Sequence, residues 1–204
     1  TTVVVPDLVG VGLDEARTMF DAARRHRVLL LESFPWYFQP QTGALLELLH
    51  GGAIGAVRGV QASFGFVLRN ADDNIRMRAD LGGGALLDAG SYPLSQIRLV
   101  MGCAPAQVVA QASWTDSGVD LSTSATLLYA DGRRAQLCCA MDTANHRRAT
   151  IAGTRGTIET EYLNHTSAQP AGDARRHHAV LDHHRHRADG AVAAHRQAAG
   201  GLDE

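Results

Sequence analysis

Long apolar runs are missing from this sequence of 204 residues. None reaches the roughly 18 residues that a transmembrane helix needs, and no charged and then apolar leader precedes the first periodic segment. Three cysteines are too few for a disulfide framework, and the adjacent Cys138 and Cys139 would point to opposite faces of a strand. The formal net charge of -2 gives no electrostatic reason to expect nucleic acid or an anionic membrane as a partner. We therefore expect a globular protein in the reducing cytoplasm.

The periodicity of apolar residues changes along the chain from helical to extended. Helical patterns cover 13–27 and 41–50, and the unbroken apolar run at 28–33 is typical of a parallel strand buried on both faces. Alternation with period two follows at 57–69, 106–115, 122–130 and 133–141, and a further hairpin is expected around 154–156. The pattern predicts an α+β fold, in which a helix and a parallel strand lead into an open, mainly antiparallel sheet with helices packed on one face.

Several residues have an expected place in this sheet. Asp131-Gly132 between two strand patterns is a strong hairpin signal. Trp114 and Tyr129 are predicted to be buried residues on a sheet face. His146, within an Asn-His-Arg-Arg run, is predicted to lie on the surface in a connection between strands.

The composition shifts sharply near residue 167. From there the sequence consists mainly of Ala, Arg, His, Gly and Asp, and six of the ten histidines fall between His177 and His195. Such a segment buries little apolar surface, so we predict a disordered tail over 167–204. Closely spaced imidazoles are adequate ligands for a transition metal, but without ordered carboxylate support we expect no metal site. An unrelated extension of the globular part remains an alternative.

The stretch GGGALLDAGSYPLSQIR, residues 82–98, carries the most specific chemistry. We expect a helix over 84–101, on which Asp88 and Tyr92, four residues apart, share a face. One interpretation is structural, with Asp88 bonded locally and Tyr92 anchoring the helix. The other is proton transfer by the Tyr92 phenol, whose ordinary pKa is about 10. A neighbouring carboxylate would raise that pKa, so a cation would have to oppose it. Pro93 lacks a backbone donor, so the helix should kink or restart at the pair.

The sequence closely resembles the glucose–fructose oxidoreductase/inositol dehydrogenase/MocA family in three stretches: GGGALLDAGSYPL, DNIR at 73–76 and LLLESFPWYFQPQT at 29–42. Its resemblance is strongest to the branch of dihydrodiol and xylose dehydrogenases, and it extends from about Leu13 to Thr166. The resemblance implies an N-terminal dinucleotide-binding domain and a C-terminal α/β domain whose open sheet often forms a homodimer interface. It also implies hydride transfer between NADP or NAD and a sugar, polyol or dihydrodiol.

The same resemblance implies roles for five residues. Tyr92 falls on the family's proton donor and acceptor, and Asp88 falls on its partner acid. Arg76 would lie near substrate or cofactor, while Trp36 and Phe66 would line the substrate side. No residue is implied as a metal ligand.

The sequence departs from the family pattern at two sites. The family's catalytic lysine lies in a Glu-Lys-Pro stretch where this chain reads Val4-Val5-Pro6, and the sequence contains no lysine at all. The dinucleotide motif G-x-G-x-x-G is also absent, since Gly10-Val11-Gly12 lacks both the spacing and a recognisable preceding strand.

These departures suggest the C-terminal part of an oxidoreductase, truncated and inactive on its own. Residues 1–33 would be the end of a dinucleotide-binding domain and 34–166 the substrate and dimerisation domain, followed by the tail at 167–204. The alternative is a non-catalytic α+β module that serves in dimerisation or ligand binding. An upstream glycine-rich βαβ unit would favour the enzyme.

Overall fold

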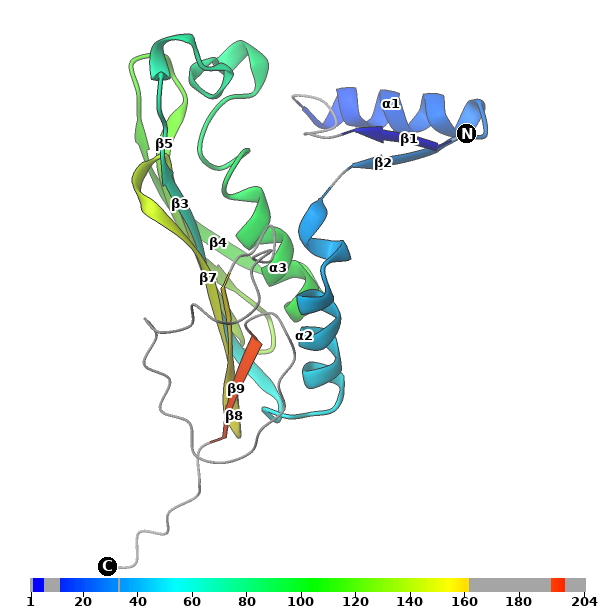
Figure 1. Cartoon of the computed structure of the whole chain (residues 1–204), viewed down its shortest axis with the longest axis vertical. Coiled ribbons are helices and arrows are strands. Elements are labelled where there is room, and N and C mark those ends of the chain that lie inside the picture. Colours follow the sequence, from blue (N-terminus) through cyan, green and yellow to red (C-terminus); the bar gives the residue numbers. More distant parts are fainter. Residues whose placement is uncertain (1, 6–11, 33, 162–191, 197–204) are drawn as a thin grey trace, which may run out of the picture.

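The computed structural model describes residues 2–5, 12–32, 34–161 and 192–196 (Figure 1). One large sheet dominates the structure, and helices cover one of its faces. A small unit of two strands and one helix stands beside it. The α+β class predicted from the sequence is confirmed.

The small unit contains β1 (Thr2–Val5), α1 (Leu13–Arg25) and β2 (Leu29–Glu32). β1 and β2 are parallel, which confirms the predicted strand direction. The predicted burial of this segment on both faces is wrong, because Leu29 is 59% exposed and exposed residues alternate with half-buried ones along β2. A parallel strand is buried on both faces only where helices cover both sides of its sheet, and this alternation indicates cover on one side.

β1 also provides a strand before Gly10 that sequence patterns did not reveal. The dinucleotide motif is still incomplete, because the position of its third glycine is occupied by Glu15. The small unit is therefore a βαβ unit without the glycine spacing that binds a pyrophosphate.

The large sheet has seven strands in the order β4-β5-β6-β3-β7-β8-β9. Neighbouring strands are antiparallel except for β3 and β6, which are parallel. The strands are β3 (Val57–Val67), β4 (Gln107–Trp114), β5 (Asp120–Leu128), β6 (Arg134–Ala140), β7 (Asp142–Gly153), β8 (Gly156–Glu161) and β9 (Val192–Arg196). The strand β9 falls within 167–204, where the sequence predicts disorder. The remainder of that range, including the histidine cluster at 177–186, lies outside the described residues.

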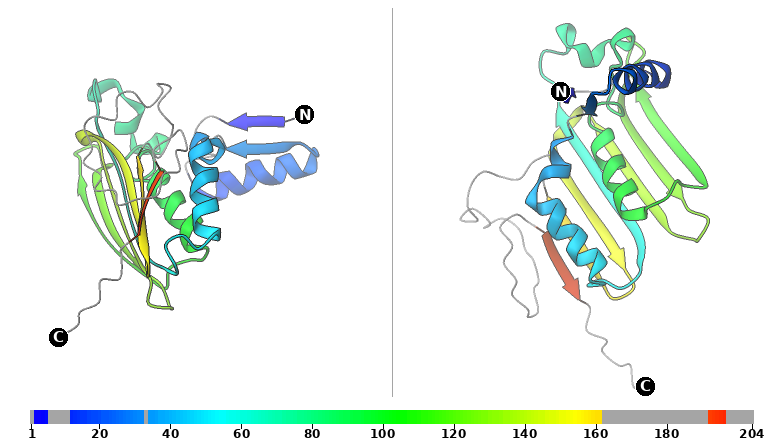
Figure 2. Two further views of the ribbon diagram at one scale, coloured as in Figure 1. Left: turned by 60° about the horizontal axis from the view of Figure 1, so that its bottom comes forward. Right: turned by 90° about the vertical axis from the view of Figure 1, so that its right-hand side faces the viewer.

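The core lies between the sheet and two helices, α2 (Pro40–His50) and α3 (Ser91–Met101), which lie side by side on one face (Figure 2). Val60, Ala62 and Phe64 of β3 are at most 5% exposed and point toward these helices, as their alternation with Gln61 and Ser63 predicts. Four short 3-10 helices complete the fold: η1 (Pro35–Phe38), η2 (Ala71–Asp73), η3 (Ile75–Met77) and η4 (Ala79–Leu81).

The turn between β5 and β6 confirms the Asp131-Gly132 hairpin. Gly132 has φ +83, a conformation that glycine adopts without a steric cost. The Asp131 carboxylate accepts a hydrogen bond from the Arg133 amide. Tyr129, next to this turn, is buried as predicted, whereas Trp114 at the end of β4 is 70% exposed in the single chain.

The helix predicted over 84–101 is shorter than expected, because α3 begins only at Ser91. Residues 84–90 form successive turns, in which the Gly90 amide donates to the Ala85 carbonyl. Pro93 lies in the first turn of α3, where its missing N–H leaves no helical acceptor unsatisfied. No helix restarts at Pro93, because α3 is preceded by turns and begins two residues earlier, and Asp88 precedes the helix that carries Tyr92.

The sheet face away from the helices is open and lined mainly by polar side chains. A shallow hollow crosses it, with Gln61, Ser63, Gln111, Ser124, Thr126, Gln136, Cys138, Arg148 and Thr150 among its lining residues. Val109 lines the same hollow and is 58% exposed. Nothing within the described part of the chain covers this face.

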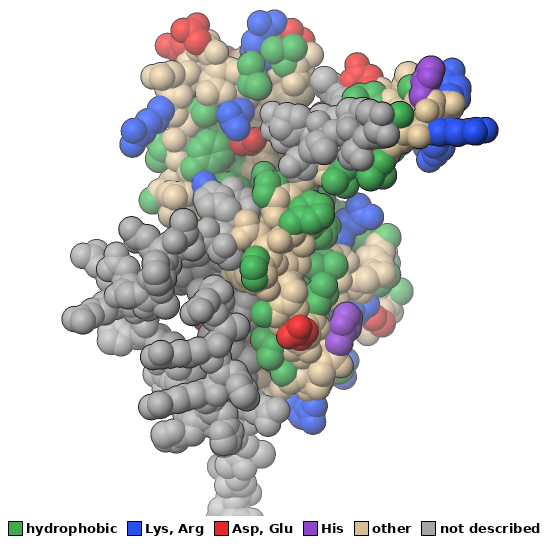
Figure 3. Space-filling model, turned by 45° about the vertical axis from the view of Figure 1, so that its right-hand side comes forward, with side chains coloured by type: hydrophobic (Ala, Val, Ile, Leu, Met, Phe, Trp, Pro, Cys, Tyr) green, Lys and Arg blue, Asp and Glu red, His purple; other side chains and the backbone are tan. Residues whose placement is uncertain are grey.

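The helix side of the molecule shows hydrophobic side chains at its surface (Figure 3). Phe38 of η1 is 70% exposed and its neighbour Tyr37 is 43% exposed, and in the small unit Leu13 and Leu29 are exposed as well. Single exposed apolar residues are common, but several in adjoining segments are typical of a surface that another domain covers. None of the described helices is both long and apolar enough to cross a membrane.

Candidate active site

Tyr92 is held between two phenylalanine rings at the start of α3. Its ring lies 5.0 Å from that of Phe34, which precedes η1, and 5.4 Å, edge-on, from that of Phe64 on β3. The Tyr92 side chain is half-buried. Three segments far apart in the sequence therefore fix the ring and leave the residue partly accessible.

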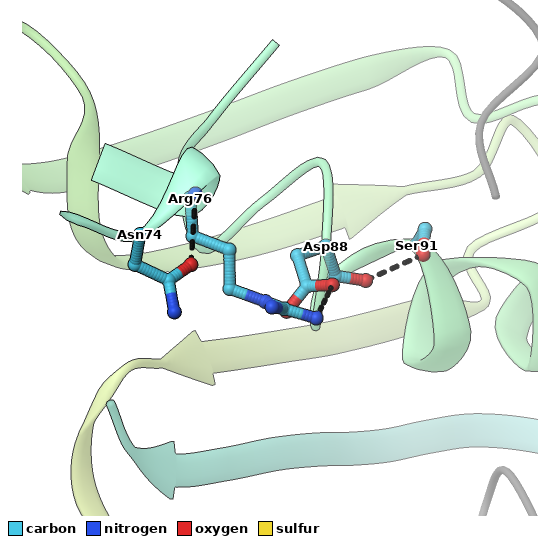
Figure 4. Close-up of polar contacts among 4 residues, drawn as sticks. All are labelled: Asn74, Arg76, Asp88 and Ser91. Atoms are coloured by element: carbon cyan, nitrogen blue, oxygen red, sulfur yellow. Dashed lines mark hydrogen bonds and ion pairs between the residues drawn. The ribbon is translucent and has the colours of Figure 1, made fainter. Parts of the chain in front are cut away.

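Asp88 forms a two-point ion pair with Arg76 (Figure 4). The Arg76 Nε donates to Asp88 Oδ2 at 2.7 Å, and Nη2 donates to Oδ1 at 3.1 Å. The backbone at both ends is fixed as well, because the Arg76 amide donates to Asn74 Oδ1 and the Ser91 hydroxyl donates to the Asp88 carbonyl. A bidentate guanidinium–carboxylate pair is geometrically specific, so the charge of Asp88 is compensated in a defined orientation.

The glycine run brings the backbone close to other parts of the same chain. The amides of Gly83 and Gly84 donate to the carbonyls of Arg78 and Arg76, so the run hydrogen-bonds directly to the segment that carries Arg76. A Cβ atom on Gly83 would lie 2.8 Å from the carbonyl oxygen of Arg78. The glycines therefore permit the close packing that places Arg76 against Asp88.

Asp120 fixes the other side of this turn and was not identified from the sequence. Its carboxylate is buried and accepts hydrogen bonds from the Leu86 amide at 2.9 Å and the Thr123 hydroxyl at 2.6 Å. The Ala85 amide donates to the Asp120 carbonyl. An aspartate at the start of a strand pattern carries no signal of this role, which depends on a contact 34 residues away along the chain.

Two of the predicted substrate-side residues occupy different environments. Phe66 is half-buried, and the Arg76 guanidinium lies 5.9 Å from its ring centroid. Trp36 is only 3% exposed, and its indole donates to the Ser95 hydroxyl, which in turn donates to the Tyr92 carbonyl. The structure therefore brings Phe66, Arg76, Asp88 and Tyr92 into one neighbourhood and places Trp36 beneath the start of α3.

Arg147 is a second residue of the site that sequence reasoning missed. It belongs to β7 together with His146, so the prediction that His146 lies in a connection between strands is wrong. The Arg147 guanidinium lies 4.6 Å from the Phe64 ring centroid. Its burial lowers the pKa of Arg147, and the nearby Tyr92 opposes that effect. The missed signal is alternation, since Ala149 and Ile151 on the same side of the strand are buried.

No group of three or more His, Cys, Asp or Glu side chains within the described residues is arranged to hold a metal ion. The site has instead a phenol between aromatic rings, a compensated carboxylate and a second guanidinium. These groups can bind an oxygen-rich ligand and exchange a proton with it.

The molecule thus has an open sheet covered on one face by helices, with a tyrosine in the first turn of one helix and an acid in the turn before it. Residues 42–159 match the GFO/IDH/MocA C-terminal domain, and the chain belongs to this family. The resemblance inferred from the sequence is thus confirmed.

The chain is similar to several curated oxidoreductases. It is 35% identical to D-xylose 1-dehydrogenase (NADP(+)) 2 of Haloferax volcanii, over 72% of this chain and 45% of that protein. It is 38% identical to dTDP-3,4-didehydro-2,6-dideoxy-alpha-D-glucose 3-reductase of Streptomyces violaceoruber, over 78% of this chain and 46% of that protein. The chain spans about half the length of the curated relatives it matches.

Solved structures show the same fold. The aldose-aldose oxidoreductase from Caulobacter crescentus superposes with a TM-score of 0.76 at 25% identity, over 83% of this chain and 52% of that one. The 3-ketoreductase KijD10 from Actinomadura kijaniata, solved with NADP and TDP-benzene, superposes with a TM-score of 0.69 at 31% identity, over 76% and 48% of the two chains.

Proposed function

We propose that this chain is the C-terminal, substrate-binding part of an NAD(P)-dependent oxidoreductase that acts on a sugar, polyol or diol. The observation that carries the proposal is the position of Tyr92, half-buried between Phe34 and Phe64 at the start of α3. Relatives named as a xylose dehydrogenase, a dihydrobenzenediol dehydrogenase and a dTDP-sugar reductase support this substrate class.

In this proposal the Tyr92 hydroxyl exchanges a proton with the substrate's carbinol or carbonyl oxygen. The flanking rings of Phe34 and Phe64 limit access of water to the phenol. The Arg76–Asp88 pair holds the turn before α3 in place and offers polar groups to the other hydroxyls of the substrate. Phe66 lines the apolar side, and Trp36 supports the backbone of Tyr92 through Ser95.

The residues of this chain do not fit a dinucleotide on their own. A pyrophosphate binds at a helix N-terminus that follows a glycine-rich turn. The helices α2 and α3 have prolines in their first turns, at Pro40 and Pro93, which removes donors there, and the residues before α1 lack the glycine spacing. We therefore propose that another domain holds the cofactor.

The small unit fits the edge of that other domain. We propose that residues 1–33 are the end of a dinucleotide-binding domain and that 34–166 form the substrate and dimerisation domain. The parallel strands β1 and β2, with Leu29 exposed, offer an edge and an apolar face on which a larger parallel sheet can continue.

Calorimetric titration with NADPH tests the proposal that another domain holds the cofactor. The chain alone should show no saturable binding in the micromolar range, because it lacks a pyrophosphate site. A chimera with the N-terminal half of the Haloferax volcanii xylose dehydrogenase placed before this chain should bind NADPH and oxidise it with a carbonyl substrate from a panel of sugars and ketones. Micromolar affinity of the chain alone would refute the cofactor assignment. A folded, NADPH-binding chimera that is inactive with every substrate would favour a non-catalytic dimerisation or ligand-binding module.

We also propose that the open face of the sheet pairs with a second copy of the chain. Its hydroxyl, amide and small apolar side chains, with Val109 58% exposed among them, have the mixed composition common at protein–protein interfaces.

We further propose a reducing compartment such as the cytoplasm, which fits the free and exposed thiols of Cys103 and Cys138.

The three cysteines report on this interface without any mutation. Cys138 lies on the open face, Cys103 is exposed elsewhere, and Cys139 is buried, which raises the pKa of its thiol to about 12. Iodoacetamide should modify Cys103 at all protein concentrations and should leave Cys139 intact until the chain unfolds. Its reaction with Cys138 should become slower over the concentration range in which sedimentation shows that the dimer forms. A dimer in which Cys138 stays as reactive as Cys103 would place the interface on another surface.

A further inference from the structure

Arg147 and Phe64 stand opposite each other in the β3–β7 register. Residues directly opposite in a sheet point to the same face, and the Phe64 side is the core face next to α3. The Arg147 guanidinium covers the Phe64 ring at 4.6 Å, and the Tyr92 ring meets the same ring edge-on at 5.4 Å. Arg147 and Tyr92 are thus organised around one aromatic ring.

Among the described residues, the other charged and titratable groups named here around Tyr92 add no net charge. In the turn before α3, Asp88 is compensated by the bidentate Arg76. Phe34, which faces Tyr92 from the segment before η1, is uncharged. On β6, Cys139 stands opposite Phe64 in the register, and its pKa of about 12 keeps the thiol neutral at physiological pH.

A phenol with an ordinary pKa of about 10 ionises more readily when a cation lies nearby. The converse effect is present at Arg147, where Tyr92 raises the pKa of the guanidinium against the lowering caused by burial. The sequence contains no lysine, so every basic residue other than histidine is an arginine. Arginine keeps its charge throughout the pH range in which a phenol titrates.

We propose that Arg147 is the cation that favours ionisation of Tyr92 and so tunes this phenol for proton transfer. The assignment rests on the proposed function of Tyr92, and Arg147 acts through Tyr92 rather than on the substrate. The positive charge comes from a strand of the C-terminal sheet and not from the segment before α1.

The titration of Tyr92 tests this proposal directly. The chain labelled with ¹³Cζ-tyrosine gives signals from Tyr37, Tyr92, Tyr129 and Tyr162, and a Tyr92→Phe spectrum assigns the one of interest. Arg147→Met should raise the titration midpoint of Tyr92 by about one pH unit, because the phenolate loses a nearby opposite charge. Circular dichroism over the same pH range limits the fit to conditions in which the chain stays folded.

Two variants separate charge from packing. Arg148→Met removes the neighbouring arginine, which points to the open face opposite Ser63, and should leave the Tyr92 midpoint unchanged. Arg147→Lys keeps the charge and should restore most of the shift, and it remains informative if Arg147→Met fails to fold. An unchanged midpoint in Arg147→Met, an equal shift in Arg148→Met, or an Arg147→Lys midpoint as high as that of Arg147→Met would overturn the proposal. The titration does not require catalytic activity. An unchanged Tyr92 midpoint therefore counts against the role of Arg147, whereas an inactive chimera counts against the proposed function.

Discussion

Replacing Tyr92 with phenylalanine should lower kcat of the active chimera by about 10²–10⁴-fold, the usual contribution of a general acid or base. The substitution preserves the ring that packs against Phe34 and Phe64 and removes only the hydroxyl. Because the lost interaction belongs to the transition state, KM should change little. Steady-state kinetics with NADPH and the substrate selected from the panel provide both constants.

Two comparisons make this result specific. Tyr37→Phe removes a hydroxyl from an exposed tyrosine that stacks on Trp36, and it should leave kcat unchanged. Asp88→Asn should cost less than Tyr92→Phe if the acid only orients its neighbours through Arg76. Equal kcat values for Tyr92→Phe and the parent chimera would move the proton transfer elsewhere and return Asp88 and Tyr92 to a structural role.

A second large effect is expected at Gly84, where an alanine should lower the free energy of unfolding by about 3 kcal/mol. Gly84 has φ +114, a backbone conformation that residues with a Cβ rarely adopt. An added Cβ would also overlap the Asp120 carboxylate. That carboxylate cannot move away cheaply, because it accepts hydrogen bonds from Leu86 and Thr123. Urea unfolding followed by circular dichroism measures the change.

Gly118→Ala is the matched control for backbone strain. Gly118 has φ +81, but nothing lies within 4 Å of an added Cβ, so this alanine should cost only about 1 kcal/mol. The difference between the two variants reports the contact with Asp120. Equal losses of unfolding free energy in Gly84→Ala and Gly118→Ala would show that the Asp120 carboxylate does not restrict the turn before α3.

Much of the sheet could be predicted because its residues alternate with period two. In β3 the buried set Val60, Ala62 and Phe64 is determined by the pleat, which sends successive side chains to opposite faces. The β5–β6 hairpin was equally predictable, since Asp131-Gly132 supplies the positive φ that the turn requires. Local geometry alone decides such features.

The errors arose where burial depends on a neighbour that the local pattern does not reveal. The apolar run at 28–33 reads as a strand buried on both faces, yet Leu29 is exposed because the packing partners of β2 decide its burial. The helix expected over 84–101 begins late because Asp120, from the start of β5, holds the backbone of residues 85 and 86 in turns.

Periodicity was enough to predict the α+β class and most strand positions, and a specific short motif led to the prediction that Asp88 and Tyr92 act together. Which charges lie near these two residues depends on the folded arrangement of distant segments. Arg76 reaches Asp88 across 12 positions of sequence, and Arg147 reaches the Phe64–Tyr92 pair through the β3–β7 register. An electrostatic interaction depends on distance in space, and the fold sets that distance for residues far apart in the chain.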